Sequence, residues 1–212
     1  MKIEQFEFNP VAVNTYLLYD ETGEAALIDC GISNKREFDM LESSLRTNRL
    51  TLKILLNTHL HFDHASGNGF IYEKYGVKPQ YDKREDEMPS LRTQIASFGL
   101  KLQYESVQGE HFIEEEELIC FGNTTLKALS TPGHSPGSLS FYSEKDNCVF
   151  TGDALFRGSI GRTDLWKGDY AALIRSVKTK LLSLPDETIV YPGHGPSTSV
   201  KREKQYNPYI NH

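Results

Sequence analysis

Residues 59–64 read His-Leu-His-Phe-Asp-His, so that four metal-capable side chains fall within six positions: His59, His61, Asp63 and His64. The apolar residues 54–56 precede this hexapeptide and predict a buried strand that emerges into a loop. Alternate positions of an extended chain point the same way, so His59 and His61 can reach one ion together. The last two members can face a second ion once the chain turns. One tetrahedral zinc requires fewer ligands, so a two-metal hydrolytic site is the first hypothesis.

Three further candidate ligands stand directly after glycines, in turns that follow predicted strands. The strands are expected over residues 124–129, 148–150 and 188–191, and the candidate ligands are His134, Asp153 and His194. The glycine lets the backbone turn sharply, so the next side chain can point inward. Each of the three alone would more often be a cap or a satisfied polar group. Beside the hexapeptide, the repeated strand–glycine–ligand pattern favours a metal-binding role for all three.

Together the seven side chains are enough for two metal ions. One ion would be held by His59, His61 and His134, and the other by Asp63, His64 and His194. The carboxylate of Asp153 would bridge the two ions. A water or hydroxide between the ions would complete each shell. Imidazole and carboxylate ligands without thiolate suit Zn²⁺, the expected metal, and also suit iron or manganese. Only His111 and His212 lie outside the set.

The composition excludes several other classes of function. The chain has 212 residues and a net charge of −6, and it has no basic stripe that could neutralise nucleic-acid phosphates. No apolar stretch has the length of a signal peptide core or a membrane span, so we expect a cytoplasmic protein with no membrane partner. The three cysteines are far apart and predict no disulfide framework. A monomer or a small homo-oligomer is expected.

The periodicity predicts strands in runs, with helices between the runs. Strands are expected over 3–8, 15–19, 25–28, 51–57, 124–129, 139–143, 148–150 and 188–191, and helices over 34–48, 68–75, 85–98 and 169–182 and from 199 onward. Pro89 interrupts the third helix early. We find no repeat, linker or domain boundary. This order indicates an α+β protein with two sheets and outer helices in a single domain, residues 1–212.

The motifs, in this order, resemble the metallo-β-lactamase superfamily. The residues that carry the resemblance are Thr58 to His64, Gly133-His134, Gly152-Asp153 and Gly193-His194-Gly195. The resemblance implies a four-layer αβ/βα sandwich with the metals at one edge of the paired sheets. True β-lactamases usually carry Cys or Ser near the bridging position. Asp153 and His64 are instead similar to the hydrolase branches of the family.

Within those branches the chain looks like the glyoxalase II-like thioesterases, the hydroxyacylglutathione hydrolases. The residues that carry this likeness are Gly152 to Leu165 and Arg202 to Tyr209. The resemblance implies hydrolysis of a small-molecule thioester, such as an S-acylglutathione, by a hydroxide that bridges two metal ions. Full-length members have a C-terminal helical domain that binds glutathione. This chain has no room for that domain, so glutathione recognition does not carry over.

Asp63, a member of the ligand set, is mainly a ligand, with proton shuttling as a secondary role. Five residues outside the ligand set also have candidate roles. Asp29 is expected either to accept a hydrogen bond from a ligand imidazole or to serve as a turn residue before Gly31. Arg162 either binds a substrate carboxylate or pairs with Asp164. The aromatic residues Phe156 and Tyr191, together with Trp166, are candidate pocket walls, for which core packing is the alternative.

Three rival functions use the same residues. A persulfide dioxygenase of the same superfamily holds one iron with two His and one Asp, here His59, His134 and Asp153, and resembles this chain at Gly161 to Asp164. A lactonase and a non-catalytic metal-binding module are further alternatives. Metal stoichiometry and substrate assays would separate them.

Overall fold

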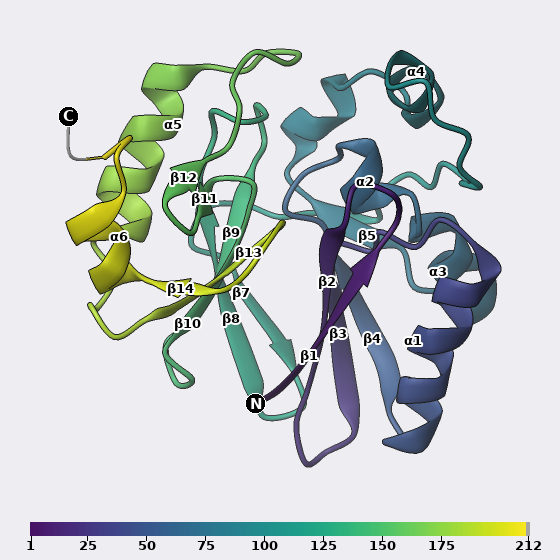
Figure 1. Cartoon of the computed structure of the whole chain (residues 1–212). Helices are drawn as coiled ribbons and strands as arrows, with labels where there is room; N and C mark the ends of the chain where they lie inside the picture. Colours follow the sequence, from purple (N-terminus) through teal and green to yellow (C-terminus); the bar gives the residue numbers. More distant parts are fainter. Residues whose placement is uncertain (211–212) are drawn as a thin grey trace.

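Two six-stranded mixed sheets pack face to face in the computed structural model, which describes residues 1–210, and helices cover both outer faces (Figure 1). The first sheet has the order β1 (Lys2–Phe8), β2 (Val13–Tyr19), β3 (Glu24–Ile28), β4 (Thr51–Leu56), β5 (Pro79–Tyr81), β6 (His111–Phe112). The second has the order β14 (Thr198–Ser199), β13 (Ile189–Pro192), β10 (Cys148–Gly152), β9 (Leu139–Ser143), β8 (Thr124–Ser130), β7 (Leu118–Phe121). The predicted four-layer αβ/βα sandwich is confirmed.

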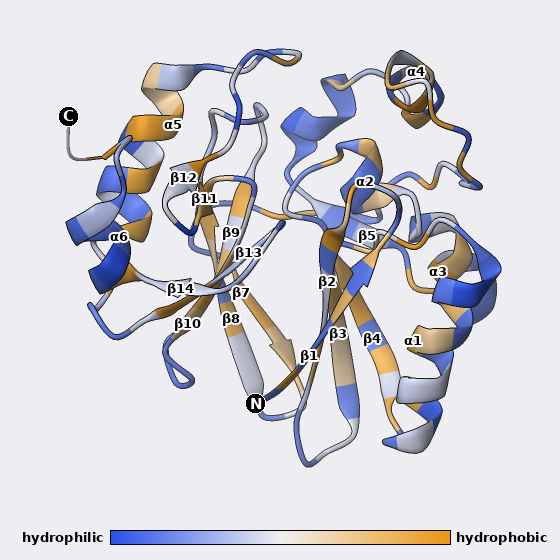
Figure 2. Ribbon diagram, in the orientation of Figure 1, coloured by the Kyte–Doolittle hydropathy of each residue, from blue (hydrophilic) through white to orange (hydrophobic). Residues whose placement is uncertain are grey.

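Helices α1 (Lys35–Thr47) and α3 (Asn68–Tyr75) lie on the outer face of the first sheet, and α5 (Tyr170–Ser176) and α6 (Val200–Tyr206) lie on that of the second (Figure 1). The buried residues of α1 are apolar, Leu41 and Leu45, whereas α6 buries Glu203 beside Val200. The solvent-facing sides of α1 and α6 are largely hydrophilic (Figure 2). Asn34 begins α1 by accepting a hydrogen bond from the backbone N–H of Glu37. No helix within residues 1–210 is both long and apolar enough to cross a membrane.

Strand β2 shows how the core is divided between layers. Its alternate residues Tyr16 and Leu18 pack between the two sheets, whereas Leu17 and Tyr19 pack under α1. The side chains of a strand alternate between faces, and all seven residues of β2 are buried. Because both faces of β2 are covered, its apolar residues occupy successive positions, 16–19, without the alternation of a surface strand.

The segment around the metal motif is more regular than the sequence predicts. The hexapeptide was expected in a loop, but its last three residues begin the short helix α2 (Phe62–Ala65). The helix expected over 85–98 is two helices, the 3-10 helix η1 (Lys83–Glu87) and α4 (Leu91–Ser97), because Pro89 stands between them. The helix expected over 169–182 continues from α5 into a π-helical turn, η2 (Val177–Leu181).

Several short strands were not predicted. They are β5, β6, β7 and β14, together with the two-stranded β11 (Leu155–Phe156) and β12 (Ser159–Ile160) that follow Asp153. Strands of two to four residues are too short to show a hydrophobic period.

Candidate metal centre

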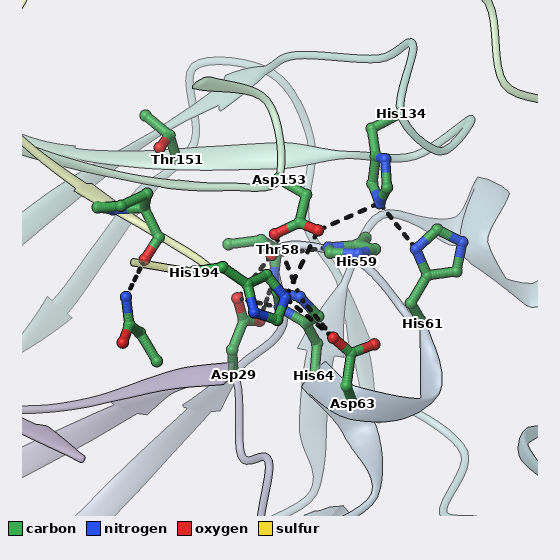
Figure 3. A network of polar contacts seen from close by, with 12 residues as sticks. Asp29, Thr58, His59, His61, Asp63, His64, His134, Thr151, Asp153 and His194 are labelled. Carbon is green, nitrogen blue, oxygen red and sulfur yellow. Dashed lines mark hydrogen bonds and ion pairs between the residues drawn. The ribbon is translucent and has the colours of Figure 1, made fainter. Parts of the chain in front are cut away.

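All seven predicted ligand side chains converge at one edge of the paired sheets (Figure 3). His59 and His61 follow β4, and α2 carries Asp63 and His64. The second sheet supplies the others from the ends of its strands: His134 after β8, Asp153 after β10 and His194 after β13. Each sheet therefore contributes about half of the site. The remaining histidines are His111, which lies on the surface beside Glu117, and His212, which is outside the described residues.

Three imidazoles form the first cluster. One nitrogen from each of His59, His61 and His134 lies within 4.8 Å of the others, and Nδ1 of His61 is 2.8 Å from Nε2 of His134. Burial lowers the pKa of His59 well below its ordinary value and that of His61 to about 3. These two imidazoles are therefore neutral near pH 7, with lone pairs free to bind a cation.

Asp63, His64 and His194 form the second cluster, again with ligand atoms within 4.8 Å of one another. Nε2 of His194 lies 3.0 Å from Oδ2 of Asp63, and Nε2 of His64 lies 3.5 Å from the same oxygen. Burial would raise the pKa of Asp63, but the neighbouring His64 and His194 outweigh it and lower that pKa. Burial likewise opposes the charge on His64, but Asp63, Asp153 and Asp29 raise its pKa well above the ordinary value. The cluster therefore attracts positive charge strongly.

Asp153 stands between the clusters. Its Oδ1 lies 3.3 Å from Nε2 of His64, and its Oδ2 lies 3.5 Å from Nε2 of His134 and 3.7 Å from Nε2 of His194. One carboxylate oxygen thus faces the second cluster, and the other reaches toward both. This is the placement that a bridging ligand requires.

The donor set fits two cations. Among the described residues, three buried atoms that face the site lack a hydrogen-bond partner: Nε2 of His59, Nε2 of His64 and Oδ1 of Asp153. Buried polar atoms without a partner are costly. Two cations among these imidazoles and carboxylates would provide a partner for all three atoms.

Hydrogen bonds to the remote ring nitrogens orient four of the five imidazoles. Nδ1 of His59 lies 3.0 Å from Thr58 Oγ1, and Nδ1 of His64 lies 2.9 Å from Asp29 Oδ2. Nδ1 of His134 lies 2.7 Å from the Arg162 carbonyl, and Nδ1 of His194 lies 3.2 Å from the Ala12 carbonyl. Such partners fix the tautomer and the orientation of a metal-binding histidine. In each case Nε2 is left to face the cluster.

Asp29 combines the two roles that its position suggested. Its carboxylate accepts hydrogen bonds from the backbone N–H and the hydroxyl of Thr58, both at 2.7 Å, and lies 2.9 Å from Nδ1 of His64. Its backbone is also a turn, in the left-handed region at φ 54°, which Asp tolerates better than most residues. Asp29 therefore joins the end of β3 to two segments of the metal site.

A cavity of about 170 Å³ opens onto both clusters. Five of its lining residues were not predicted from the sequence: Val11, Phe62, Gln94, Phe98 and Leu165. They come from the β1–β2 turn, α2, α4 and the loop after β12. These segments meet only in the folded chain, so no local pattern identifies them.

Of the residues predicted to bind substrate, Arg162 is among those that line the cavity, and the aromatic residues are not. Arg162 lines it, but its guanidinium makes two hydrogen bonds to Asp164, at 2.7 and 2.8 Å. Phe156 packs edge-on against His194, with ring centroids 6.3 Å apart. Tyr191 stacks on Phe150 in the core between the sheets, so core packing replaces the predicted pocket wall. Trp166 is exposed and is not among the residues that line the cavity.

Glu85 is a buried carboxylate that was not predicted to be near the site. Its Oε2 accepts from the backbone N–H of Leu60 at 2.8 Å, and its Oε1 accepts from the Ser135 hydroxyl and the Gly137 N–H at 2.7 and 2.6 Å. Burial raises its pKa, against the effect of these donors. Glu85 thus ties the hexapeptide to the loop that carries His134. It also lines a larger cavity of about 480 Å³, which contains none of the seven clustered side chains.

Comparison with known proteins agrees with this geometry. The profile of the Metallo-beta-lactamase superfamily matches residues 8–194. The chain is 36% identical to the hydroxyacylglutathione hydrolase GloC of Haemophilus influenzae, over all of this chain and 99% of that protein. It is 34% identical to the probable metallo-hydrolase YqgX of Bacillus subtilis, over all of this chain and 98% of that protein.

Solved structures show the same fold over the whole chain. BLEG-1 B3 metallo-beta-lactamase superposes with a TM-score of 0.90 at 34% identity and covers all of both chains. TTHA1623 in a di-iron-bound form gives a TM-score of 0.86 at 34% identity, over 97% of this chain and 99% of the other. ETHE1 from Myxococcus xanthus gives 0.80 at 29% identity, over 98% and 84%. The ligand clusters, the paired sheets and the sequence matches agree, and the chain belongs to the metallo-beta-lactamase superfamily.

Proposed function

We propose that this protein is a metal-dependent hydrolase that cleaves small-molecule thioesters at a centre of two divalent metal ions. The observation that carries the proposal is the position of Asp153 between two complete ligand clusters. His59, His61 and His134 would hold one ion, the second cluster would hold the other, and Asp153 would bridge them. When bound, the two ions supply a hydroxide nucleophile at neutral pH and polarise the substrate carbonyl. Zn²⁺ is proposed, and iron or manganese suits the same ligands.

The residues around the cavity favour a substrate whose leaving group needs no proton from the protein. Among residues 1–210, Arg162 is the one titratable residue that lines the cavity besides the seven proposed ligands, and it is paired with Asp164. A thiol has a pKa of about 8.5, so it can leave as the thiolate. An amine or an alkoxide ordinarily requires a general acid. The lining thus supports thioester hydrolysis.

The apolar walls of the cavity position the rest of the substrate. Val11, Phe62, Phe98 and Leu165 form the apolar part of its lining. A substrate packed against them would displace water there, which strengthens electrostatic interactions with the reacting carbonyl. The volume of about 170 Å³ suits a short acyl group. The similarity to a hydroxyacylglutathione hydrolase supports the same chemistry, and we propose a thioester of glutathione or of another small thiol as substrate.

The test combines metal analysis with a hydrolysis assay. The purified protein should contain two metal ions per chain and should hydrolyse S-D-lactoylglutathione or a related thioester. His59→Ala should lose at least one ion and nearly all activity, because it removes a ligand whose Nε2 is buried within the site. His111→Ala is the matched control, since His111 is exposed beside Glu117. Full activity in His59→Ala would refute the proposed centre.

Two rival activities have specific support. The Gly161–Asp164 element, which resembles the persulfide dioxygenases of the superfamily, favours a mononuclear iron persulfide dioxygenase. The similarity to BLEG-1 makes a β-lactam a substrate worth assaying in parallel. One iron per chain with oxygen uptake on a persulfide would replace the proposed function, and so would efficient β-lactam cleavage without thioester hydrolysis.

A further inference from the structure

His61 is held differently from the other imidazoles of the site. The other four present Nε2 to the clusters and have Nδ1 within hydrogen-bond distance of a protein oxygen. His61 presents Nδ1, which lies 2.8 Å from Nε2 of His134. Its own Nε2 has no hydrogen-bond partner among residues 1–210. Because metal-binding histidines usually have such a partner, something else must fix the orientation of His61.

The Gln94 side chain holds the backbone on both sides of His61. Its Oε1 accepts a hydrogen bond from the N–H of Phe62 at 2.9 Å, and its Nε2 donates to the carbonyl of Leu60 at 3.0 Å. The same Nε2 donates to the carbonyl of Pro89 at 2.7 Å. Gln94 is only 8% exposed, so little water competes for these bonds. The amide group therefore fixes the two peptide groups that determine where the His61 ring can point.

These bonds also provide the helix cap that His61 does not. His61 is the N-cap residue of α2, and its side chain makes no capping hydrogen bond. The N–H groups at the start of a helix lack partners within the helix. Gln94 supplies the partner for Phe62, the first residue of α2, from a different helix. The His61 ring is thus left free to face the metal cluster.

We propose that Gln94 is a positioning residue for His61, and through it for the metal site formed by His59, His61 and His134. The inference rests on the proposed metal centre, and it extends that centre to α4. Loss of the amide should let the His61 backbone move while every ligand remains in the chain. The effect should be larger on the ion that His61 would hold, since the two peptide groups bonded to Gln94 flank His61 directly, whereas Asp63 and His64 follow in the helix that begins at Phe62.

The test is a double-mutant cycle that measures Zn²⁺ affinity by competition with a chelator. Gln94→Met removes all three hydrogen bonds and nearly keeps the volume. It should weaken one of the two Zn²⁺ binding steps about 10- to 100-fold, the usual effect of losing a residue that supports a metal ligand. In a His61→Ala background the same change should alter affinity less than about 2-fold, because coupled residues are not additive. Gln205→Met is the control, on an exposed position of α6.

The outcomes separate a positioning role from a structural one. An equal loss of affinity in both backgrounds, or no loss in either, would overturn the inference even if the melting temperature of the metal-free protein falls. If Gln94→Met does not fold, Gln94→Ala serves in the same comparison, because its shorter side chain does not place an apolar group against the carbonyls of Leu60 and Pro89. Wild-type protein without two tight Zn²⁺ sites would overturn the proposed function as well. Wild-type protein with two sites, and Gln94 variants that match it, would overturn only the inference about Gln94.

Discussion

Gly193 is a residue of the site at which space for a side chain is very limited. A Cβ atom there would lie 2.2 Å from Oδ1 of Asp153 and 2.7 Å from Cε1 of His64. The sequence predicts that glycines before the ligands serve sharp turns, and this holds for Gly152 (φ +49°) and Gly133 (φ +135°). Gly193 does not have a positive φ, so its glycine is required by close approach instead.

Gly193→Ala should therefore damage the site while leaving every ligand in place. The methyl group would displace Asp153 or His64, and overpacking of this kind costs about 1–3 kcal/mol. We expect fewer than two metal ions per chain by elemental analysis and a lower free energy of unfolding. Gly195→Ala is the control, because a Cβ there has no neighbour within 4 Å, although its φ of +72° adds strain. Equal metal content in the two variants would contradict this account.

Local pattern explains which site residues could be predicted. Each ligand group stands next to a strand that is itself recognisable, so the sequence brings the ligands to one edge. Glu85 and Gln94 carry no such signal. The groups near the ligands that Glu85 contacts lie 25 to 52 positions away in the sequence. Those that Gln94 contacts lie 32 and 34 positions away. A buried Glu or Gln in a short helix looks, in the sequence alone, like an ordinary surface residue.

At the scale of elements, Asp20 joins the turns of two hairpins, one from each sheet. Its carboxylate accepts from the N–H of Asn123 at 2.7 Å and the hydroxyl of Thr124 at 2.9 Å in the β7–β8 turn. It also accepts from the N–H of Thr22 at 2.9 Å in its own turn. The β2–β3 turn lies at the end of the first sheet away from α2 (Figure 1). The two sheets are thus linked at the end opposite the metal site.

This link should depend on pH. Burial would raise the pKa of Asp20, but hydrogen bonds from Thr22, Thr124 and Asn123 outweigh it and lower that pKa to about 2. Because the folded value lies below the unfolded value of about 3.9, the stabilisation is complete above pH ~4 and is lost as the pH falls toward about 2. Asp20→Asn should lower the free energy of unfolding by about 1–2 kcal/mol at pH 7 and by roughly half as much at pH 3, with the rest of the difference lost toward pH 2.

Denaturant unfolding of wild type and variant across this pH range measures the difference. Asp39→Asn serves as the control, because Asp39 is an exposed helix residue paired with Lys35, and such pairs contribute little. A difference between wild type and Asp20→Asn that stays constant from pH 7 to pH 3 would show that the carboxylate charge is not what stabilises the junction.

The elements differ in how far they follow from sequence. Long strands such as β1, β2 and β8 show a hydrophobic pattern, and α1 has both a cap and an apolar face. Strands β6, β11, β12 and β14 have two residues each. They form because they pair with other strands, some adjacent and some distant in the sequence. The interruption of the 83–97 segment between η1 and α4 follows from Pro89, which the sequence shows directly.

At the scale of the whole molecule, the metal centre spans both sheets. The ligands after β4 belong to the first sheet, and those after β8, β10 and β13 belong to the second. Without cations, the edge of the sandwich would hold buried imidazoles and carboxylates with unpartnered atoms. Ions bound here would therefore stabilise the contact between the sheets, and their contribution to stability should be measurable without any substrate.

Removal of the metals should lower the melting temperature markedly. A ligand present at 1,000 times its dissociation constant stabilises a fold by about 4 kcal/mol. For a chain of this size each kcal/mol corresponds to about 2–4 °C, so complete chelation should lower the melting temperature by roughly 8–16 °C. Differential scanning calorimetry before and after chelation, and after Zn²⁺ is restored, measures this shift. His59→Ala should show a smaller shift, because it begins with less metal. An unchanged melting temperature after verified removal of all metal would mean that the Asp20 junction and the core hold the sheets together without help from the site.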